Sequence, residues 1–415
     1  MEYLLNIVSF LIFAYSCKST KYKQSLLVIY SGLWFFVSFM YSFHFYGLYD
    51  VKDETLLMYI LGIIFYFVGY ITYRQHYYVF FTRVDNYRKK MIILKILILI
   101  SIVVLFKKSL LAIPLWLSGG VDNLKSSIVE QKSLSLGFWG DFFFTFVARP
   151  MLMVAVLYSV ILLFQNKKEY CLYIFTFVMS FLGYVCTGSK FIIMELVTMV
   201  FTYLLIFRGG QIYALFRYNK KIFYSTFLVI VLLLLLLNSK DGELCQSIYI
   251  YLCGCIPCSD KALIIIDEHP HFYGTITFNG FFRIFSLPLS FLGNEFKDIL
   301  DNGFLFMQKF EHTMHISPTI SYNAFISLYS YFYADGGLVG VALFSFLFGY
   351  FSNKICTQSI LNPTYMNVAM LLFTSILIST SMVRANTFMI YYVLPYFYIY
   401  FLIPKSSFLL NDDSF

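Results

Sequence analysis

Residues 321–351 read SYNAFISLYSYFYADGGLVGVALFSFLFGYF, an apolar run longer than the roughly 20 residues that a helix needs to cross a bilayer. The run nevertheless contains an amide at Asn323, an acid at Asp335 and several glycines. An ionisable group at membrane depth is costly unless it is paired, so such a residue is a functional candidate. The stretch therefore predicts a membrane helix and marks a candidate site within it.

The whole chain has the composition of a polytopic membrane protein. Of its 415 residues, 60% are hydrophobic and 13% are charged, whereas about 25% of an ordinary soluble protein is charged. The mean hydropathy is +0.75. The net charge of +8 lies in short clusters between apolar runs. Because no basic stripe with interleaved aromatic residues accompanies it, we expect no nucleic-acid partner.

Apolar windows of about 20 residues predict an all-α fold with eleven transmembrane helices. Their ranges are 3–17, 25–46, 56–73, 91–106, 141–164, 170–187, 190–207, 222–237, 321–351, 365–382 and 386–403. Alternate loops carry most of the Lys and Arg, so the positive-inside rule makes that side cytoplasmic. We therefore expect a multi-pass membrane protein with its N-terminus outside and its C-terminus cytoplasmic. An acid at Glu2 and no small-residue cleavage site indicate a retained first helix and not a signal peptide.

We expect one domain, residues 1–415, because no internal repeat or soluble-domain boundary is visible. Residues 107–140 are broken by Pro and Gly and predict an interfacial helix followed by a loop. Residues 238–320 form the longest predicted extracytoplasmic loop and contain four of the six histidines. Long loops are uncommon unless functional or disordered, and this one is too aromatic to be disordered. Its segment 278–293, FNGFFRIFSLPLSFLG, is typical of an interfacial or re-entrant helix.

Asp335 has two interpretations. It could be the N-cap of a new helical run, or an acid that acts in catalysis or binds a substrate hydroxyl. Gly336 and Gly340 form a GxxxG pattern, which lets two helices approach closely, and Gly337 permits a break. We expect these glycines to bring Asp335 close to a neighbouring helix.

Asn323, Ser327 and Ser330 recur at i, i+4 and i+7, which predicts one polar helical face. Lipid is a poor neighbour for such a face, so it should point into the bundle. It could make interhelical hydrogen bonds or recognise sugar hydroxyls.

Several cations do not follow the positive-inside pattern. They are Arg149, Lys190 in CTGSKF, Lys240, Arg283 and Arg384 in SMVRANTF. Each could be a snorkelling cation or a lipid-headgroup contact. As a set they are better explained by an anionic ligand, and Arg suits a diphosphate because its planar fork makes two charge-assisted bonds.

Three titratable residues precede the quoted stretch. Glu311, His312 and His315 in FEHTMHISP could supply a general base, although a loop histidine is usually inert. Cys253, Cys255 and Cys258, near Cys245, could form a disulfide, a thiol cluster or a metal site. No His or second CxxC completes a metal-ligand pattern, so we expect no metal. No P-loop, GxGxxG, HExxH or GxSxG occurs, which disfavours nucleotide-driven transport, a Rossmann cofactor, a zinc protease and a serine hydrolase.

These residues resemble a known family. GYVCTGSKF, FYGTITFNGFFRIF and YNAFISLYSYFYADGGLVGVALFSFLFGYFS, with about eleven helices and one late outer loop, resemble the Wzy-type O-antigen and capsule polymerases. Members have an N-A-F run, then aromatic residues, an acid and two glycines, which fall here on Asn323, Ala324, Phe325, Asp335, Gly336 and Gly340. The motif resemblance covers roughly residues 180–350. A basic residue follows a G-S pair, here Lys190 where Arg is commoner. Some members have an Arg followed ten residues later by Gly in two outer loops, and here Gly293 lies ten residues after Arg283.

The resemblance implies a GT-C-like glycosyltransferase of the bacterial cytoplasmic (inner) membrane. On the outer face of that membrane it would join polyprenyl-diphosphate-linked oligosaccharide repeat units into O antigen or capsular polysaccharide. Lys190, Lys240, Arg283 and Arg384 would bind the diphosphate, and Asn323 and Ser327 the sugars. Asp335, Glu311, His312 or His315 would be the base. The lipid diphosphate is already activated, so no cofactor is implied. The implied partners are the lipid-linked oligosaccharide, membrane lipid, and a chain-length regulator and flippase of the same lipopolysaccharide or capsule pathway.

Two alternatives stay open. An O-antigen ligase also pairs many helices with one large outer loop. A flippase or other transporter of lipid-linked oligosaccharide is a different class, and such transporters commonly contain repeats and matching broken helices. This chain has no such symmetry.

Overall fold

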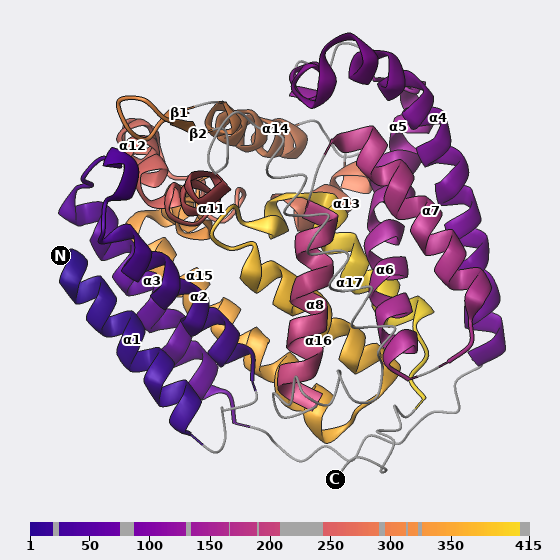
Figure 1. Cartoon of the computed structure of the whole chain (residues 1–415), viewed down its shortest axis with the longest axis horizontal. Coiled ribbons are helices and arrows are strands. Elements are labelled where there is room, and N and C mark those ends of the chain that lie inside the picture. The colour runs from indigo at the N-terminus through magenta and orange to yellow at the C-terminus, as the bar shows by residue number, and fades with distance from the viewer. Residues whose placement is uncertain are drawn as a thin grey trace. The chain divides into compact units, whose positions relative to one another are not determined.

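The structure is a computed structural model. It describes residues 1–19, 25–74, 87–129, 134–165, 167–188, 191–207, 244–289, 295–312, 314–322 and 326–406. The described chain is mostly helical, as Figure 1 shows, which confirms the predicted all-α class. Within these ranges the only strands are β1 (Met314–His315) and β2 (Ser321–Tyr322), which pair antiparallel.

The elements follow in chain order. They are α1 (Glu2–Lys18), α2 (Leu26–Tyr41), η1 (Phe45–Gly47), α3 (Asp53–Thr72), α4 (Tyr87–Val129), α5 (Gly137–Phe143), the π-helical η2 (Phe144–Ala148), α6 (Arg149–Phe164), α7 (Tyr170–Thr187), α8 (Phe191–Phe207), α11 (Leu244–Cys253), α12 (Cys255–Asp267), α13 (Asn279–Leu289), α14 (Glu295–Gln308), η4 (Lys309–Glu311), α15 (Leu328–Leu361), α16 (Tyr365–Ser379), η5 (Asn386–Phe388) and α17 (Ile390–Leu402).

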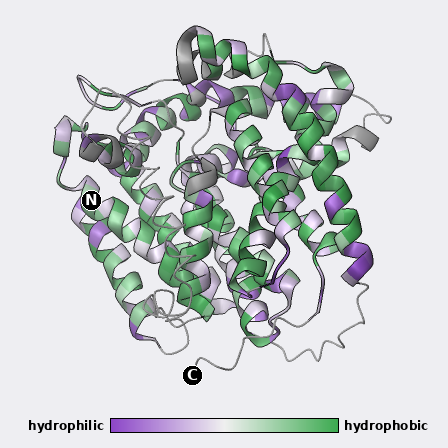
Figure 2. Ribbon diagram, turned by 45° about the vertical axis from the view of Figure 1, so that its right-hand side comes forward, coloured by the Kyte–Doolittle hydropathy of each residue, from purple (hydrophilic) through white to green (hydrophobic). Residues whose placement is uncertain are grey.

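Six helical stretches of the described chain are long and apolar enough to cross a membrane. They are Asp53–Thr72, Tyr87–Ser118, Gly137–Phe164, Tyr170–Thr187, Tyr249–Asp267 and Leu328–Leu361. Shorter apolar helices include α2, α16 and α17. Apolar residues run along most of these helices in Figure 2, as a lipid environment requires. The predicted helix at 222–237 lies outside the described residues.

Three elements differ from the sequence-based expectation. Helix α4 continues through Pro114 to Val129, so helical structure after residue 107 is confirmed, whereas the break expected at Pro114 is wrong. Helix α15 begins at Leu328, later than the predicted 321, because Ser321 and Tyr322 belong to β2. The Tyr249–Asp267 stretch of the expected outer loop is itself apolar enough to span a membrane.

The chain divides into two compact units. One consists of Met1–His76, Thr202–Thr357 and Thr374–Met389, and the other of Tyr77–Phe201, Gln358–Phe373 and Ile390–Phe415. Each unit is therefore assembled from three separate segments of the chain.

The first unit contains α1, α2 and α3 side by side (Figure 1). Small residues allow close packing in this unit. A Cβ on Gly349 of α15 would lie 2.0 Å from the carbonyl oxygen of Tyr66, and one on Gly69 would lie 2.0 Å from that of Phe346. Glycine at both positions therefore permits α3 and α15 to touch backbone to backbone, which is typical of membrane helix pairs. The close approach predicted for Gly336 and Gly340 is wrong: an added Cβ on Gly336 meets nothing within 4 Å, and the atoms nearest to one on Gly340 belong to Phe332 and Asp335 of its own helix.

The second unit is built around α4 and α7, which pack along each other (Figure 1). The Trp116 indole N–H donates to the Val185 carbonyl at 2.9 Å. Charged side chains in this unit form ion pairs or lie against aromatic rings. Lys108 lies 3.5 Å from Asp141, and the Arg149 guanidinium lies 3.6 Å from the centre of the Tyr391 ring. Arg149, one of the predicted anion-binding cations, is therefore stacked on an aromatic ring.

Candidate functional site

The candidate site begins where α15 is broken. Gly337 has φ +58°, a left-handed conformation that favours glycine, and the helix is interrupted at Gly336 and Gly337. The break predicted from these glycines is confirmed. It lies directly after Asp335, whose side chain is buried at 1% exposure.

Asp335 is bound to the backbone of a distant segment. One carboxylate oxygen accepts the Ile276 N–H at 3.1 Å, and the other accepts the Thr277 N–H at 2.7 Å. These residues form the turn that leads into α13. The predicted N-cap of the following helical run is therefore not formed; the Asp335 carboxylate instead holds a turn of another segment. Two bonds to one carboxylate also balance much of the cost of burying it.

The same segment is joined to α15 through the main chain. The Phe272 N–H donates to the Ala334 carbonyl at 3.2 Å, and the Tyr273 N–H donates to the Asp335 carbonyl at 2.9 Å. The break at Gly336 and Gly337 disturbs the helical pairing of these carbonyls, so they are available to accept N–H groups from elsewhere. We call residues 267–289 and 295–309 the docked segment.

A phenol and two carboxylates meet beside the contact between α15 and the docked segment. The Tyr333 hydroxyl lies 2.9 Å from an oxygen of Asp267 and 3.1 Å from one of Glu54. Both acids are exposed, while Tyr333 is 6% exposed. A phenol has one hydrogen, so it donates to one carboxylate at a time. The other carboxylate is left with capacity to accept a proton or hydrogen bond from a bound molecule.

Sequence reasoning missed Glu54 and Asp267. They lie in α3 and α12, and each looks like an ordinary acid at the end of an apolar run. Only their shared contact with Tyr333 distinguishes them. Their position in the sequence could have identified them, since each lies at the end of a helix long enough to cross a membrane.

Arg283, predicted to bind diphosphate, is fixed between three partners. Its Nη2 donates to Asp301 of α14 at 2.7 Å, its Nε donates to Asn279 at 2.7 Å, and its guanidinium lies 4.8 Å from the centre of the Phe304 ring. The buried Asn279 also donates to the Leu300 carbonyl at 2.9 Å. The Arg283 guanidinium is therefore held in one orientation by these partners, and Asp301 offsets part of its charge.

The segment containing Arg384 reaches the same aromatic ring. The Arg384 N–H donates to the Thr380 carbonyl at 3.1 Å. Phe388 of the following η5 stacks on Phe304 with ring centres 5.1 Å apart, and η5 packs against α13. The structure thus brings the segments of two predicted cations, Arg283 and Arg384, onto one ring. Lys190, Lys240 and Asn323 lie outside the described residues.

A cavity of about 310 Å³ lies between α14 and the loop after α12. It is lined by His269, Phe272, Asn302, Leu305, Phe306 and Lys309. Four of these residues are on α14 or directly after it, at spacings that share one helical face. The other two precede the turn that Asp335 holds. The cavity wall is therefore fixed by the same anchor.

Ser327 lies in a buried hydrogen-bond network. It accepts the Tyr59 hydroxyl at 2.9 Å, and the Ser330 hydroxyl donates to Ser259 at 2.8 Å, while Ser259 lies 3.3 Å from Ser327. Ser327 precedes α15, so the predicted continuous helical face is wrong at this position. These contacts join α3, α12 and α15, as the interhelical interpretation predicted.

The predicted histidine cluster lies on a small hairpin. His315 is in β1, where its Nδ1 lies 3.1 Å from the Ser321 hydroxyl and its carbonyl accepts the Lys261 ammonium. His312 is exposed, and Glu311 belongs to η4. Among the described contacts, none joins His312 or His315 to Asp335. Cys253, Cys255 and Cys258 are buried, and no disulfide occurs within the described part of the chain.

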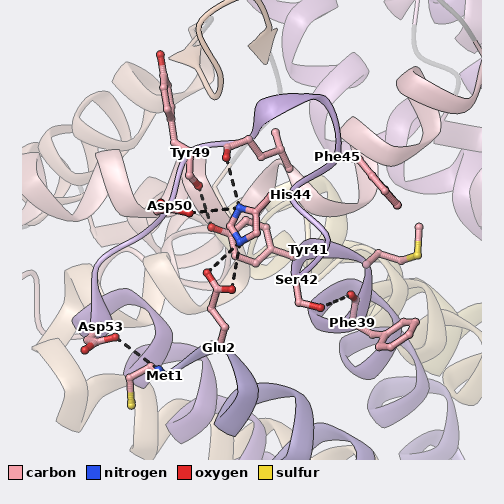
Figure 3. A network of polar contacts seen from close by, with 12 residues as sticks. Met1, Glu2, Phe39, Tyr41, Ser42, His44, Phe45, Tyr49, Asp50 and Asp53 are labelled. Carbon is pink, nitrogen blue, oxygen red and sulfur yellow. Dashed lines mark hydrogen bonds and ion pairs between the residues drawn. The ribbon is translucent and has the colours of Figure 1, made fainter.

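A separate cluster joins the start of α1 to the loop after α2 (Figure 3). The Nε2 atom of His44 lies 3.1 and 3.2 Å from the two carboxylate oxygens of Glu2, and its Nδ1 lies 3.5 Å from Asp50. The two acids face different ring nitrogens, which is the arrangement of an imidazolium paired on both sides. Burial lowers the pKa of His44, but the hydrogen bond to Glu2 and the nearby negative charges outweigh this effect, so the pKa is raised from its ordinary value.

Comparisons with protein-family models, curated proteins and solved structures give no match.

Proposed function

We propose that the chain is a membrane glycosyltransferase that polymerises polyprenyl-diphosphate-linked oligosaccharide repeat units. The observation that carries this proposal is the anchor at Asp335. It assembles an oriented arginine, a pair of acids and an aromatic cavity from separate segments. Polymerisation needs these three features: a cation for the diphosphate, a base for the acceptor and a surface for sugar rings.

In the proposed reaction, a hydroxyl oxygen of the acceptor glycan attacks the anomeric carbon of the donor glycan. The bond from that carbon to the diphosphate oxygen breaks, and polyprenyl diphosphate leaves with the electron pair. Arg283 and Arg384 stabilise the charge on the leaving group. The acceptor proton passes to Asp267 or Glu54, which Tyr333 orients. Asp335 acts through position, because it is buried at 1% exposure and its two oxygens hold the N–H groups of the turn before α13.

The proposal includes a GT-C-like arrangement of eleven spans in a bacterial cytoplasmic membrane. The N-terminus would be outside and the C-terminus cytoplasmic, which puts the docked segment on the outer face. A flippase would deliver the lipid-linked units, and a chain-length regulator would limit the product. Lys190, Lys240, Asn323, Glu311, His312 and His315 stay predictions for substrate contact or base chemistry.

Deletion of the gene tests the proposal in cells. The expected result is surface lipid that carries a single repeat unit, with the ladder restored by the wild-type gene. Polymer that is made but not attached to its lipid acceptor would indicate a ligase. Loss of all surface repeats would indicate a flippase, and either result would overturn the polymerase.

A further inference from the structure

The 310 Å³ cavity has the chemistry of a site for an acidic sugar. Its volume is near the low end of the roughly 300–1,000 Å³ typical of small-molecule sites. Three rings form its aromatic part: His269 stacks on Phe272 with centres 4.9 Å apart, and Phe306 lies 4.6 and 5.1 Å from these two rings. Aromatic faces carry partial negative charge. They therefore attract the C–H face of a pyranose ring.

Polar groups accompany the rings on the same side. Asn302 supplies an amide that both donates and accepts, as neighbouring sugar hydroxyls require. Lys309 places its ammonium 5.5 Å from the centre of the Phe306 ring. Among the described side chains, no carboxylate forms an ion pair with Lys309, and none of the lining residues is acidic. The cavity thus offers an available positive charge.

The cavity is built before any ligand arrives. The Phe272 and Tyr273 N–H groups are bonded to α15, and Asp335 holds the next turn. An added Cβ on Gly303 would lie 3.4 Å from Ile276 and 3.6 Å from Phe272, so α14 packs directly against this loop. A wall fixed in this way loses little conformational entropy on binding.

We propose that this cavity binds a pyranose ring bearing a carboxylate, such as a uronic acid residue of a glycan. The ring lies against His269 and Phe272, which the buried Phe306 supports from below, Asn302 bonds its hydroxyls, and Lys309 pairs with its carboxylate. This deepens the proposed function, since the glycan of the lipid-linked substrate would supply the sugar. A lipid phosphate could also meet Lys309, but it would leave the aromatic surface unused.

Ligand-observed NMR on the full chain in nanodiscs tests the site. The probes are methyl glucuronide, methyl glucoside and glycerol phosphate. Wild-type protein should bind glucuronide saturably and more tightly than the other two. Lys309→Gln should weaken glucuronide binding by about tenfold, because a charge-assisted bond is lost, and leave glucoside binding unchanged. Phe306→Leu should weaken binding of both sugars, because Phe306 packs against His269 and Phe272 and holds their rings in place.

Lys297→Gln is the matched control, since Lys297 is an exposed lysine of α14, which ends directly before Lys309, and does not line the cavity. Lys309 is also exposed, so its substitution should leave the fold intact. Absence of glucuronide binding, equal loss in both lysine variants, or preference for glycerol phosphate would overturn the proposal. Glucuronide binding without polymerisation would refute the polymerase but support the acidic-sugar site. Polymerisation without glucuronide binding would support the polymerase and refute the site.

Discussion

Asp335 accepts the N–H of Thr277 at 2.7 Å, so a 1%-exposed acid in a broken apolar helix holds a turn from a segment 58 residues away. This bond and its neighbour from Ile276 fix the start of α13, on which Arg283 lies. The acid that sequence analysis marked as a catalyst or cap thus positions other candidate residues. Substitution of Asp335 should therefore disturb the local structure, and affect activity through that disturbance.

Asp335→Ala should destabilise the docked segment. Loss of two charge-assisted bonds should lower the free energy of local opening by about 3 kcal/mol. Hydrogen exchange measures this directly, as faster exchange of the amides of residues 272–278. Asp335→Asn should have an intermediate effect, because one amide oxygen remains as an acceptor. Unchanged exchange together with lost polymer formation would instead indicate that Asp335 is a general base.

Arg283→Ala should shorten or abolish the glycan ladder while membrane abundance stays normal. Arg283→Lys should rescue it only in part, since an ammonium keeps the charge and loses the two-pronged geometry. Gel analysis of surface glycan reads out both variants, with Lys297→Gln as the control. A wild-type ladder in the Ala variant would remove Arg283 from the site.

Tyr333→Phe should slow polymerisation without loss of the protein from the membrane. The substitution removes the only described hydrogen-bond donor shared by Glu54 and Asp267, so neither acid is oriented. Turnover with a lipid-linked repeat unit measures the effect, and we expect about a tenfold decrease. Asp267→Asn should be at least as severe if Asp267 takes the acceptor proton. Normal turnover in both variants would exclude the acid pair from the reaction.

His44 should make stability depend on pH. Its pKa is raised in the folded protein, so protonation favours the folded state. The stabilisation is fully present below the ordinary value of 6.5 and is lost as pH rises through the raised folded value. The difference in melting temperature between wild type and His44→Gln should therefore be largest in acid and shrink toward alkaline pH. A difference that grows with pH would contradict the imidazolium pair.

The sequence predicted those parts of the fold that local apolarity decides. Helix α7 covers the predicted 170–187, because its apolar run is bounded by charges on one side and by Gly188 on the other. The break at Gly337 was also foreseen, since consecutive glycines weaken a helix locally. Helix α4 was not, because its Pro and Gly residues suggested an end, whereas Pro114 and the glycines after it lie within a continuous helix.

The site was less accessible from sequence because its contacts join distant segments. Asp335 was singled out by its apolar surroundings, but nothing near it in sequence indicates Thr277 as its partner. Glu54 and Asp267 carry no pattern that separates them from other acids at helix ends. The close contact of Gly69 and Gly349 was likewise hidden, while the more obvious GxxxG at Gly336 pointed to the wrong place.

The central claim is tested most directly by the purified protein in liposomes with lipid-linked repeat units as the sole substrate. The account predicts a ladder of polymer on the lipid, formed without nucleotide or ion gradient, with polyprenyl diphosphate released in step with each new linkage. Movement of the intact lipid-linked unit across the bilayer, with no linkage formed and no diphosphate released, would contradict it.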